Sequence, residues 1–323
     1  MRKLMWIIPL IGFLGCSDDD GVSGTRYVDD IFSDVSTTLD IKYGENAALV
    51  GITQDLYLDV YEPSGDQEVN RPLLILAHGG AFVSGTKTQI KDLCNAYALK
   101  GYVVASIGYR LINDPSISDS VAYSEGVVLA LGDLKAAIRY MRNDALNGIS
   151  ESFSSRYPTF IDMTPPADTP PMIIILGSTL NVGYLDENDS EIPEYLLNHL
   201  NTHGGFEGDS NEINVSSEVQ GILSFSGSVF RDAWIDSNDP PIFMVHDEFD
   251  PVVPCEYEDT NVVPFPILAY GSCSILDALE EADISSELVI IEGSDGHVSY
   301  LGEDQGQEII DKSAQFISQE ILN

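Results

Sequence analysis

Short, almost wholly apolar runs recur along this chain, and each is too short to be a typical helix. They lie at residues 73–77, 103–107, 172–176, 222–225, 242–245 and 288–291. Runs of this length suit strands that are buried on both faces of a parallel sheet. Residues 54–61 instead alternate apolar and polar side chains, which predicts a strand with one buried face.

Apolar residues at helical spacing stand between these runs. Val127, Leu131, Leu134, Ile138 and Met141 step by four, three, four and three, and residues 310–321 repeat the pattern. The alternation predicts an α/β fold: a doubly wound, mostly parallel sheet with helices on both faces, a three-layer sandwich. Two stretches interrupt it, 150–171 and 186–214, and we expect insert loops or caps over a site at the strands' C-terminal ends.

The charge of the chain excludes one class of partner. Its 323 residues include 52 acidic and only 15 basic side chains, a net charge of −37. Phosphate backbones are bound by Lys and Arg surfaces, so we expect no nucleic-acid partner. The four cysteines do not have metal-binding spacing, and neither a metal nor another cofactor is expected.

The N-terminus has the pattern of a targeting segment. Arg2 and Lys3 precede an apolar run of 12 residues, 4–15. A bilayer span needs about 20 residues, so residues 1–15 are interpreted as a signal peptide. Residues 16–26 then form an acidic flexible tether, and 27–323 form one domain.

The end of that segment, Phe13-Leu14-Gly15-Cys16, resembles a bacterial lipobox. The acidic residues after Cys16 resemble the surface-export signal of Bacteroidetes lipoproteins. These resemblances imply a lipidated Cys16 and an outer-membrane or cell-surface lipoprotein that contacts the membrane only through its anchor. Ordinary secretion after cleavage at a small residue is the alternative.

A set of ordered motifs resembles one family. His78-Gly79-Gly80 directly follows the run 73–77, with Asp59-Val60-Tyr61 before it and Gly108-Tyr109-Arg110 after it. From about residue 54 to 300 the chain resembles the bacterial carboxylesterase/lipase branch of the α/β-hydrolase family. The resemblance implies an oxyanion hole formed by the backbone amides of Gly79 and Gly80. His78 is interpreted as a structural ring that supports the loop.

The same resemblance assigns an acid and a base. The segment 241–254 matches the family's strand end that carries the triad acid, and Asp250 takes that position. Of the five histidines only His297 lies beyond it, in a segment that matches the family's histidine loop. A neutral imidazole there would accept a proton while Asp250 fixes its tautomer. A surface histidine in a turn and a solvated aspartate are the alternative.

The nucleophile motif departs from the family. Gly-x-Ser-x-Gly should follow the run 172–176, but Gly177-Ser178-Thr179-Leu180-Asn181 stands there. In the best register Thr179 takes the nucleophile position, and Ser178 is the other candidate. A β-branched residue tolerates the strained elbow poorly, and Leu180 and Asn181 crowd positions that small residues usually keep open. The elbow is degenerate.

Two functions follow from these observations. The first is an extracytoplasmic carboxylic ester hydrolase acting on a small-molecule or glycan-linked ester. The second is a catalytically inactive relative that binds a ligand or a partner. A peptidase of the prolyl-oligopeptidase type shares the triad order but lacks the propeller-sized N-terminal extension. Outside the cytoplasm, Cys255 and Cys273 could pair as a disulfide, or both could stay free thiols.

Overall fold

A computed structural model describes residues 24–47, 51–68, 70–112, 120–147, 172–176, 192–261, 265 and 267–322. Within them an eight-stranded sheet has the order β1-β2-β4-β3-β5-β6-β8-β11. Its strands are β1 (Val35–Ala47), β2 (Thr53–Pro63), β3 (Leu73–Ala77), β4 (Val103–Ile107), β5 (Met172–Leu176), β6 (Gly221–Phe225), β8 (Ile242–Asp247) and β11 (Ser286–Ile291). Only the pairs β1–β2 and β2–β4 are antiparallel, which confirms the predicted mostly parallel sheet.

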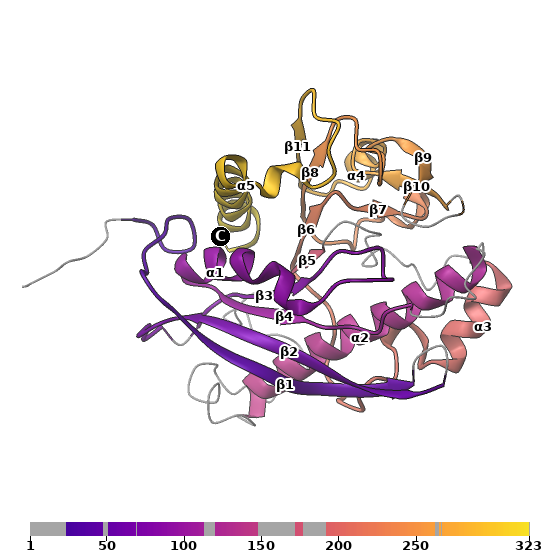
Figure 1. The fold of residues 1–323 in the computed structure, drawn as a ribbon, viewed down its shortest axis with the longest axis horizontal. Coiled ribbons are helices and arrows are strands. Elements are labelled where there is room, and N and C mark those ends of the chain that lie inside the picture. Colours follow the sequence, from indigo (N-terminus) through magenta and orange to yellow (C-terminus); the bar gives the residue numbers. More distant parts are fainter. Residues whose placement is uncertain are drawn as a thin grey trace, which may run out of the picture.

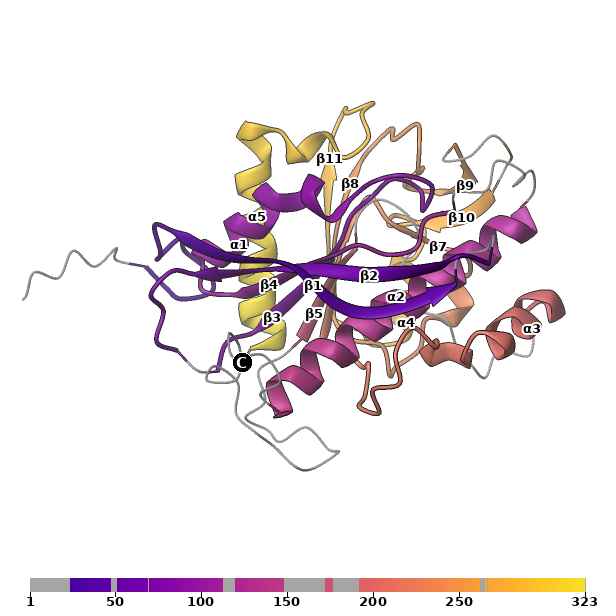
Figure 2. The same ribbon diagram turned by 60° about the horizontal axis from the view of Figure 1, so that its bottom comes forward.

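Helices cover both faces of this sheet (Figures 1 and 2). On one face lie α1 (Lys91–Leu99) and α5 (Glu303–Phe316), which continues into the π-helical turn η6 (Ile317–Ile321); on the other lie α2 (Ser120–Asn147), α3 (Glu194–Thr202) and α4 (Leu276–Glu281). Alternate residues of β3 point to opposite layers. Ile75 packs in the core with α2, whereas Leu74 and Leu76 pack in the core with α1. Burial on both faces therefore explains the continuous apolar runs.

Three segments differ from their sequence interpretation. The edge strand β1 was not anticipated, because only two of its thirteen side chains are buried and its sequence carries no apolar pattern. The 186–214 insert is not all loop: it contains α3, whose Leu196 and Leu200 are buried. Arg26, assigned to the flexible tether, forms an ion pair with Asp66 and so belongs to the folded domain. The insert 150–171 lies outside the described residues.

A second, smaller sheet stands beside the C-terminal half of the large one (Figure 1). It consists of β7 (Ser228–Val229), β10 (Ile267–Gly271) and β9 (Tyr257–Thr260), all antiparallel. A disulfide joins Cys255 to Cys273 and so encloses β9 and β10. Short 3₁₀ turns complete the described chain: η1 (Lys87–Ile90), η3 (Gly205–Glu207), η4 (Asp232–Trp234) and η5 (Ser299–Leu301). Across the described ranges, no helix has both the length and the apolarity to cross a membrane.

Candidate functional site

The expected site residues follow strands whose C-terminal ends share one edge of the sheet. His78-Gly79-Gly80 follow β3, Asp250 follows β8, and His297 follows β11. The edge of a parallel sheet at these ends is the usual place for a site. Leu176 at the end of β5 pairs with Ala77 of β3, so β5 ends beside the glycine loop. Thr179 and Ser178, the nucleophile candidates, and Cys16 lie outside the described residues.

Asp250 is fixed by its own loop. Its side chain is buried, and Oδ1 accepts hydrogen bonds from the backbone N–H groups of Val252 (2.8 Å) and Val253 (3.0 Å). These two bonds leave Oδ2 to face the histidine loop. Oδ2 lies 2.7 Å from Nδ1 of His297. The acid and the base inferred from the sequence are therefore in direct contact.

The contact determines what His297 can do. A carboxylate only accepts, so Nδ1 of His297 donates its proton to Asp250 and Nε2 keeps its lone pair. The side chain of His297 is 21% exposed, so the ring can reach a substrate. A neutral imidazole held in this tautomer is suited to take a proton from a hydroxyl group and to return it to a leaving group.

A second histidine, His246, contacts the loop that carries Asp250, which we call the acid loop. The buried His246 contacts the Val253 carbonyl through Nε2 (2.7 Å) and the Ser272 hydroxyl through Nδ1 (3.0 Å). Burial lowers the pKa of His246, opposed by the Val253 carbonyl and by Asp250, so the ring is neutral. Nε2–H then donates to Val253 and Nδ1 accepts from Ser272. This ring was not singled out in the sequence, because its role depends on contacts up to 26 residues away.

The glycine loop after β3 has an unusual backbone. Gly80 has φ +117°, and Ala81 and Phe82 follow with φ of 55° and 61°. A Cβ atom on Gly80 would lie 2.2 Å from the Ser84 carbonyl oxygen, so only glycine fits there. Within the described part of the chain, the N–H groups of Gly79 and Gly80 donate no hydrogen bond. Two unpaired amides at a sheet edge are the donors that an oxyanion hole needs.

His78 has a structural place under this loop. Its buried ring stacks on Tyr109 with centroids 4.4 Å apart, and Nδ1 donates to the Gly79 carbonyl at 2.8 Å. Burial lowers the pKa of His78, against the opposing effect of that carbonyl, so the ring stays neutral. Its ring has the supporting position inferred from the sequence.

Aromatic side chains connect the glycine loop to the acid side of the site. The Tyr123 hydroxyl on α2 donates to the Ala81 carbonyl at 3.2 Å, and its ring makes an edge contact with Phe265 at 6.2 Å. The loop before Phe265 is tied to the acid loop, because the N–H of Asn261 donates to the Val252 carbonyl at 2.7 Å. Tyr123 stands four residues before Val127, so the helical period of α2 could have indicated it; nothing local indicated Phe265.

Arg110, from the Gly108-Tyr109-Arg110 motif, forms a buried ion pair with Asp133 of α2. Both are buried, and the guanidinium Nε of Arg110 lies 2.9 Å from Oδ2 of Asp133. Ser210 also donates to Asp133, at 2.5 Å. Burial raises the pKa of Asp133, with the Arg110 charge opposing. The pair joins the loop after β4 to α2 and is structural.

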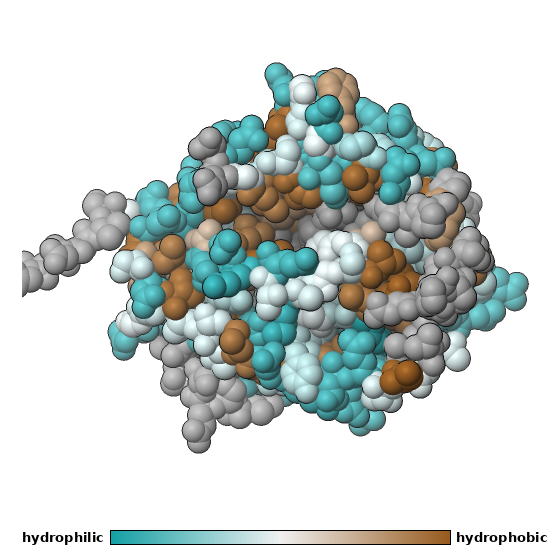
Figure 3. Space-filling view, viewed as in Figure 1, coloured by the Kyte–Doolittle hydropathy of each residue, from teal (hydrophilic) through white to brown (hydrophobic). Residues whose placement is uncertain are grey.

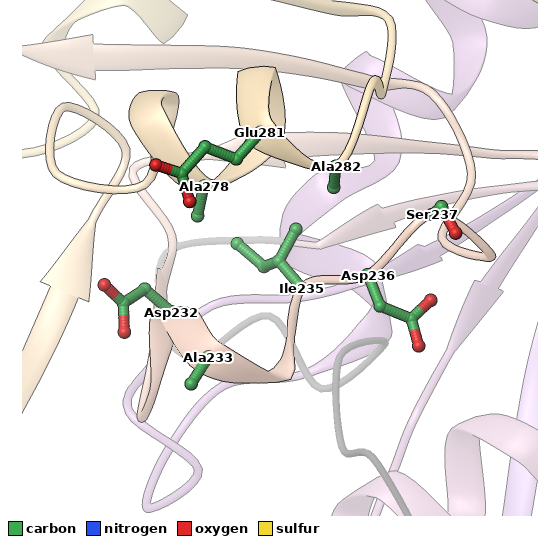
Figure 4. A pocket seen from close by; sticks show the side chains of 8 residues that line it. All are labelled: Asp232, Ala233, Ile235, Asp236, Ser237, Ala278, Glu281 and Ala282. Carbon is green, nitrogen blue, oxygen red and sulfur yellow. The ribbon is translucent and has the colours of Figure 1, made fainter.

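Apolar side chains gather on one face of the molecule. Figure 3 shows apolar side chains gathered around a hollow near the centre of the face seen in Figure 1. A separate cavity of about 520 Å³ lies between η4 and α4, where Asp232, Asp236 and Glu281 surround Ile235 (Figure 4). Of the expected site residues that the structure describes, none lines it. Among the described residues, no cluster of three His, Cys, Asp or Glu side chains has the arrangement to hold a metal ion.

Comparisons with known proteins bear on this arrangement. A family model described as BD-FAE matches residues 58–148, the part that holds the glycine loop. No curated protein matches the sequence. Among solved structures, esterase 2 of Thermogutta terrifontis phosphoramylated by tabun has a TM-score of 0.58 and 17% identity, covering 88% of this chain and 94% of that chain.

Two other forms of the same thermophilic esterase are similar. The propionate-bound form has a TM-score of 0.57 and 18% identity over 88% of this chain and 94% of that chain. The apo form has a TM-score of 0.56 and 17% identity over 90% and 96%. The chain therefore has the α/β-hydrolase fold, as the order of its motifs led us to expect.

Proposed function

We propose that this protein is an extracytoplasmic carboxylic ester hydrolase in which Asp250 and His297 activate a hydroxyl group of Thr179 or Ser178. The observation that carries the proposal is the 2.7 Å contact between Asp250 Oδ2 and His297 Nδ1. That contact stands at the sheet edge that also carries Gly79 and Gly80, whose N–H groups donate no hydrogen bond to the described residues.

The proposed reaction has two steps. The hydroxyl oxygen attacks the ester carbonyl carbon while Nε2 of His297 takes the hydroxyl proton, and the amides of Gly79 and Gly80 bind the resulting oxyanion. Collapse of this intermediate breaks the ester C–O bond, and His297 gives its proton to the leaving alcohol. Water then attacks the acyl-enzyme by the same route and releases the acid. Asp250 holds Nδ1–H throughout and stabilises the imidazolium.

Two observations bear on the substrate class. The similar esterase 2 was solved with propionate and with butyrate bound. An apolar hollow on the molecular face also suits an acyl chain (Figure 3). We therefore assign short acyl esters of small molecules or glycans. The lipobox-like Cys16 and its acidic tether favour a site of action at the cell surface.

A rate measurement tests the proposal. The soluble domain is assayed on p-nitrophenyl esters of increasing acyl length, together with His297→Ala and the control His203→Ala, at the residue that follows α3. Hydrolysis by the wild type and by His203→Ala, lost in His297→Ala, supports the proposal. A folded wild type that hydrolyses none of the esters contradicts it.

The degenerate elbow favours a second function. Thr179 is β-branched, and Leu180 and Asn181 replace small residues, so the chain could instead bind an ester or its acid without cleaving it. In that case calorimetry detects binding of butyrate to a protein that shows no hydrolysis. Turnover that depends on His297 rules this function out.

A further inference from the structure

A second carboxylate precedes Asp250 by three residues. Asp247 ends β8 and is buried. Its Oδ2 accepts the backbone N–H of Ser299 at 3.0 Å, and its Oδ1 accepts the Ser299 hydroxyl. Burial raises the pKa of Asp247, but hydrogen bonds from Ser294 and Ser299 outweigh it and lower the pKa. The carboxylate is therefore charged at neutral pH, and its bonds to Ser299 are charge-assisted.

The residue between Ser299 and His297 is strained. Val298 has φ 56° and ψ 30°, the left-handed region that β-branched residues rarely adopt. Such a conformation is unfavourable and persists only where the surroundings hold it. Asp250 accepts a hydrogen bond from His297, the residue before Val298, and Asp247 accepts two hydrogen bonds from Ser299, the residue after it. The residues on both sides of Val298 are thus fixed by two carboxylates that stand three positions apart, at and just after the end of β8.

The chain beyond Ser299 has its own anchor. The buried Tyr300 hydroxyl lies 2.9 Å from the hydroxyl of Ser226, at the end of β6. Tyr300 therefore keeps its place in the core when the bonds to Asp247 are removed. The loss of Asp247 should free the turn at 297–299 without unfolding the chain that follows.

We propose that Asp247 is a positioning residue for His297: by binding Ser299 it keeps Val298 left-handed and so sets the direction in which the imidazole presents Nε2. The catalytic part of this inference rests on the proposed ester hydrolysis. The geometric part does not, because the orientation of the ring exists whether or not the protein turns over a substrate.

The test uses four variants of the whole soluble domain. Asp247→Asn weakens both hydrogen bonds between Asp247 and Ser299, whereas Ser299→Ala removes only the bond from the Ser299 hydroxyl. Asp247→Asn/Val298→Gly adds a residue that is left-handed without strain. Asp295→Asn is the control, since it removes an exposed carboxylate from the histidine loop itself. Two readouts are taken: the low-field NMR signal of the His297 Nδ1 proton, and kcat and KM on a short-chain ester.

We expect Asp247→Asn to shift or broaden the His297 proton signal and to lower kcat about tenfold or more, with KM changed by less than about twofold. Ser299→Ala should act in the same direction but less. Val298→Gly should restore both readouts in the Asp247→Asn background, and Asp295→Asn should leave both unchanged. Restoration by glycine separates a positioning role from general destabilisation.

Two results overturn the inference. One is an unmoved His297 signal in folded Asp247→Asn or, should that variant not fold, in Ser299→Ala. The other is a shift that Val298→Gly fails to reverse. If the signal moves as expected while the wild type hydrolyses no ester, the proposed function fails and the positioning role stands.

Discussion

Tyr109 supports His78 in two ways at once. Its ring stacks on the imidazole at 4.4 Å, and its hydroxyl donates to the His78 carbonyl oxygen at 2.7 Å. The residue after His78 begins the glycine loop, so the path of the two candidate oxyanion amides depends on a tyrosine that follows the neighbouring strand, β4. The motif Gly108-Tyr109-Arg110 thus supports the backbone that leads into the glycine loop.

Tyr109→Phe should separate these two contributions. The phenylalanine ring keeps the stacking, whereas the buried His78 carbonyl loses its hydrogen bond. The free energy of unfolding should fall by about 1 kcal/mol, and kcat for ester hydrolysis should fall with it. Denaturant titration and steady-state kinetics measure the two effects. Tyr102→Phe is the matched control, because it removes a 2.9 Å bond to the Tyr27 carbonyl in the opposite core; a kcat loss of equal size there would contradict the interpretation.

Gly85→Ala should distort the same glycine loop, because the added methyl group would collide with the His78 ring. Gly85 has φ +111°, and a Cβ atom there would lie 2.3 Å from Nδ1 of His78. Gly65 has φ +77° with nothing within 4 Å of its Cβ position. Gly65→Ala therefore carries backbone strain alone, about 1 kcal/mol, and should keep its activity. Thermal unfolding and kcat compare the two variants; equal behaviour would show that the His78 contact does not shape the loop.

Asp250→Asn should reverse the tautomer of His297. The asparagine oxygen can keep the bonds from Val252 and Val253, so its NH₂ group would face Nδ1. Nδ1 must then accept, and Nε2 carries the proton and cannot act as a base. A loss of kcat of about 10⁴-fold is expected, as such a change produces in Ser-His-Asp enzymes. Combining it with His297→Ala should add little further loss, whereas additive losses would indicate independent roles.

The buried His246 predicts how stability depends on pH. Its pKa in the folded protein is below the ordinary 6.5, so the unfolded chain binds the proton more tightly. The stabilisation is complete above about pH 6.5 and is lost as the pH falls toward the folded pKa. His246→Asn should reduce the dependence of the unfolding free energy on pH, below about pH 6.5, by up to about 1.4 kcal/mol per pH unit. Equal slopes in both proteins would refute this origin.

The layers of the fold could be predicted because each strand carries its own signal. The segments 73–77 and 172–176 are apolar throughout and 103–107 is apolar except for Ser106, since parallel strands are covered on both faces, and they coincide with β3, β5 and β4. β1 could not be predicted, because an edge strand with exposed side chains needs no such pattern. α3 was hidden by its short length and acidic flanks.

The candidate site could be predicted only where the family resemblance supplied an order of residues. Asp250 and His297 are 47 positions apart, and nothing local requires their contact. The bond from Tyr123 to Ala81 spans 42 positions and belongs to no motif. The left-handed Val298 was equally hidden, because a β-branched residue gives no signal for that conformation. Such contacts depend on how the loops pack, which spacing alone does not determine.

The most direct test of the account is covalent labelling with a fluorophosphonate, followed by mass spectrometry of the adduct. Esterase 2, which has a similar fold, was solved phosphorylated by paraoxon. Such a reagent reacts with an activated hydroxyl beside its base and oxyanion hole. We predict one adduct, on Thr179 or Ser178, in the wild type and none in His297→Ala. A folded wild type that takes no label, or a label that persists without His297, would contradict ester hydrolysis by this site.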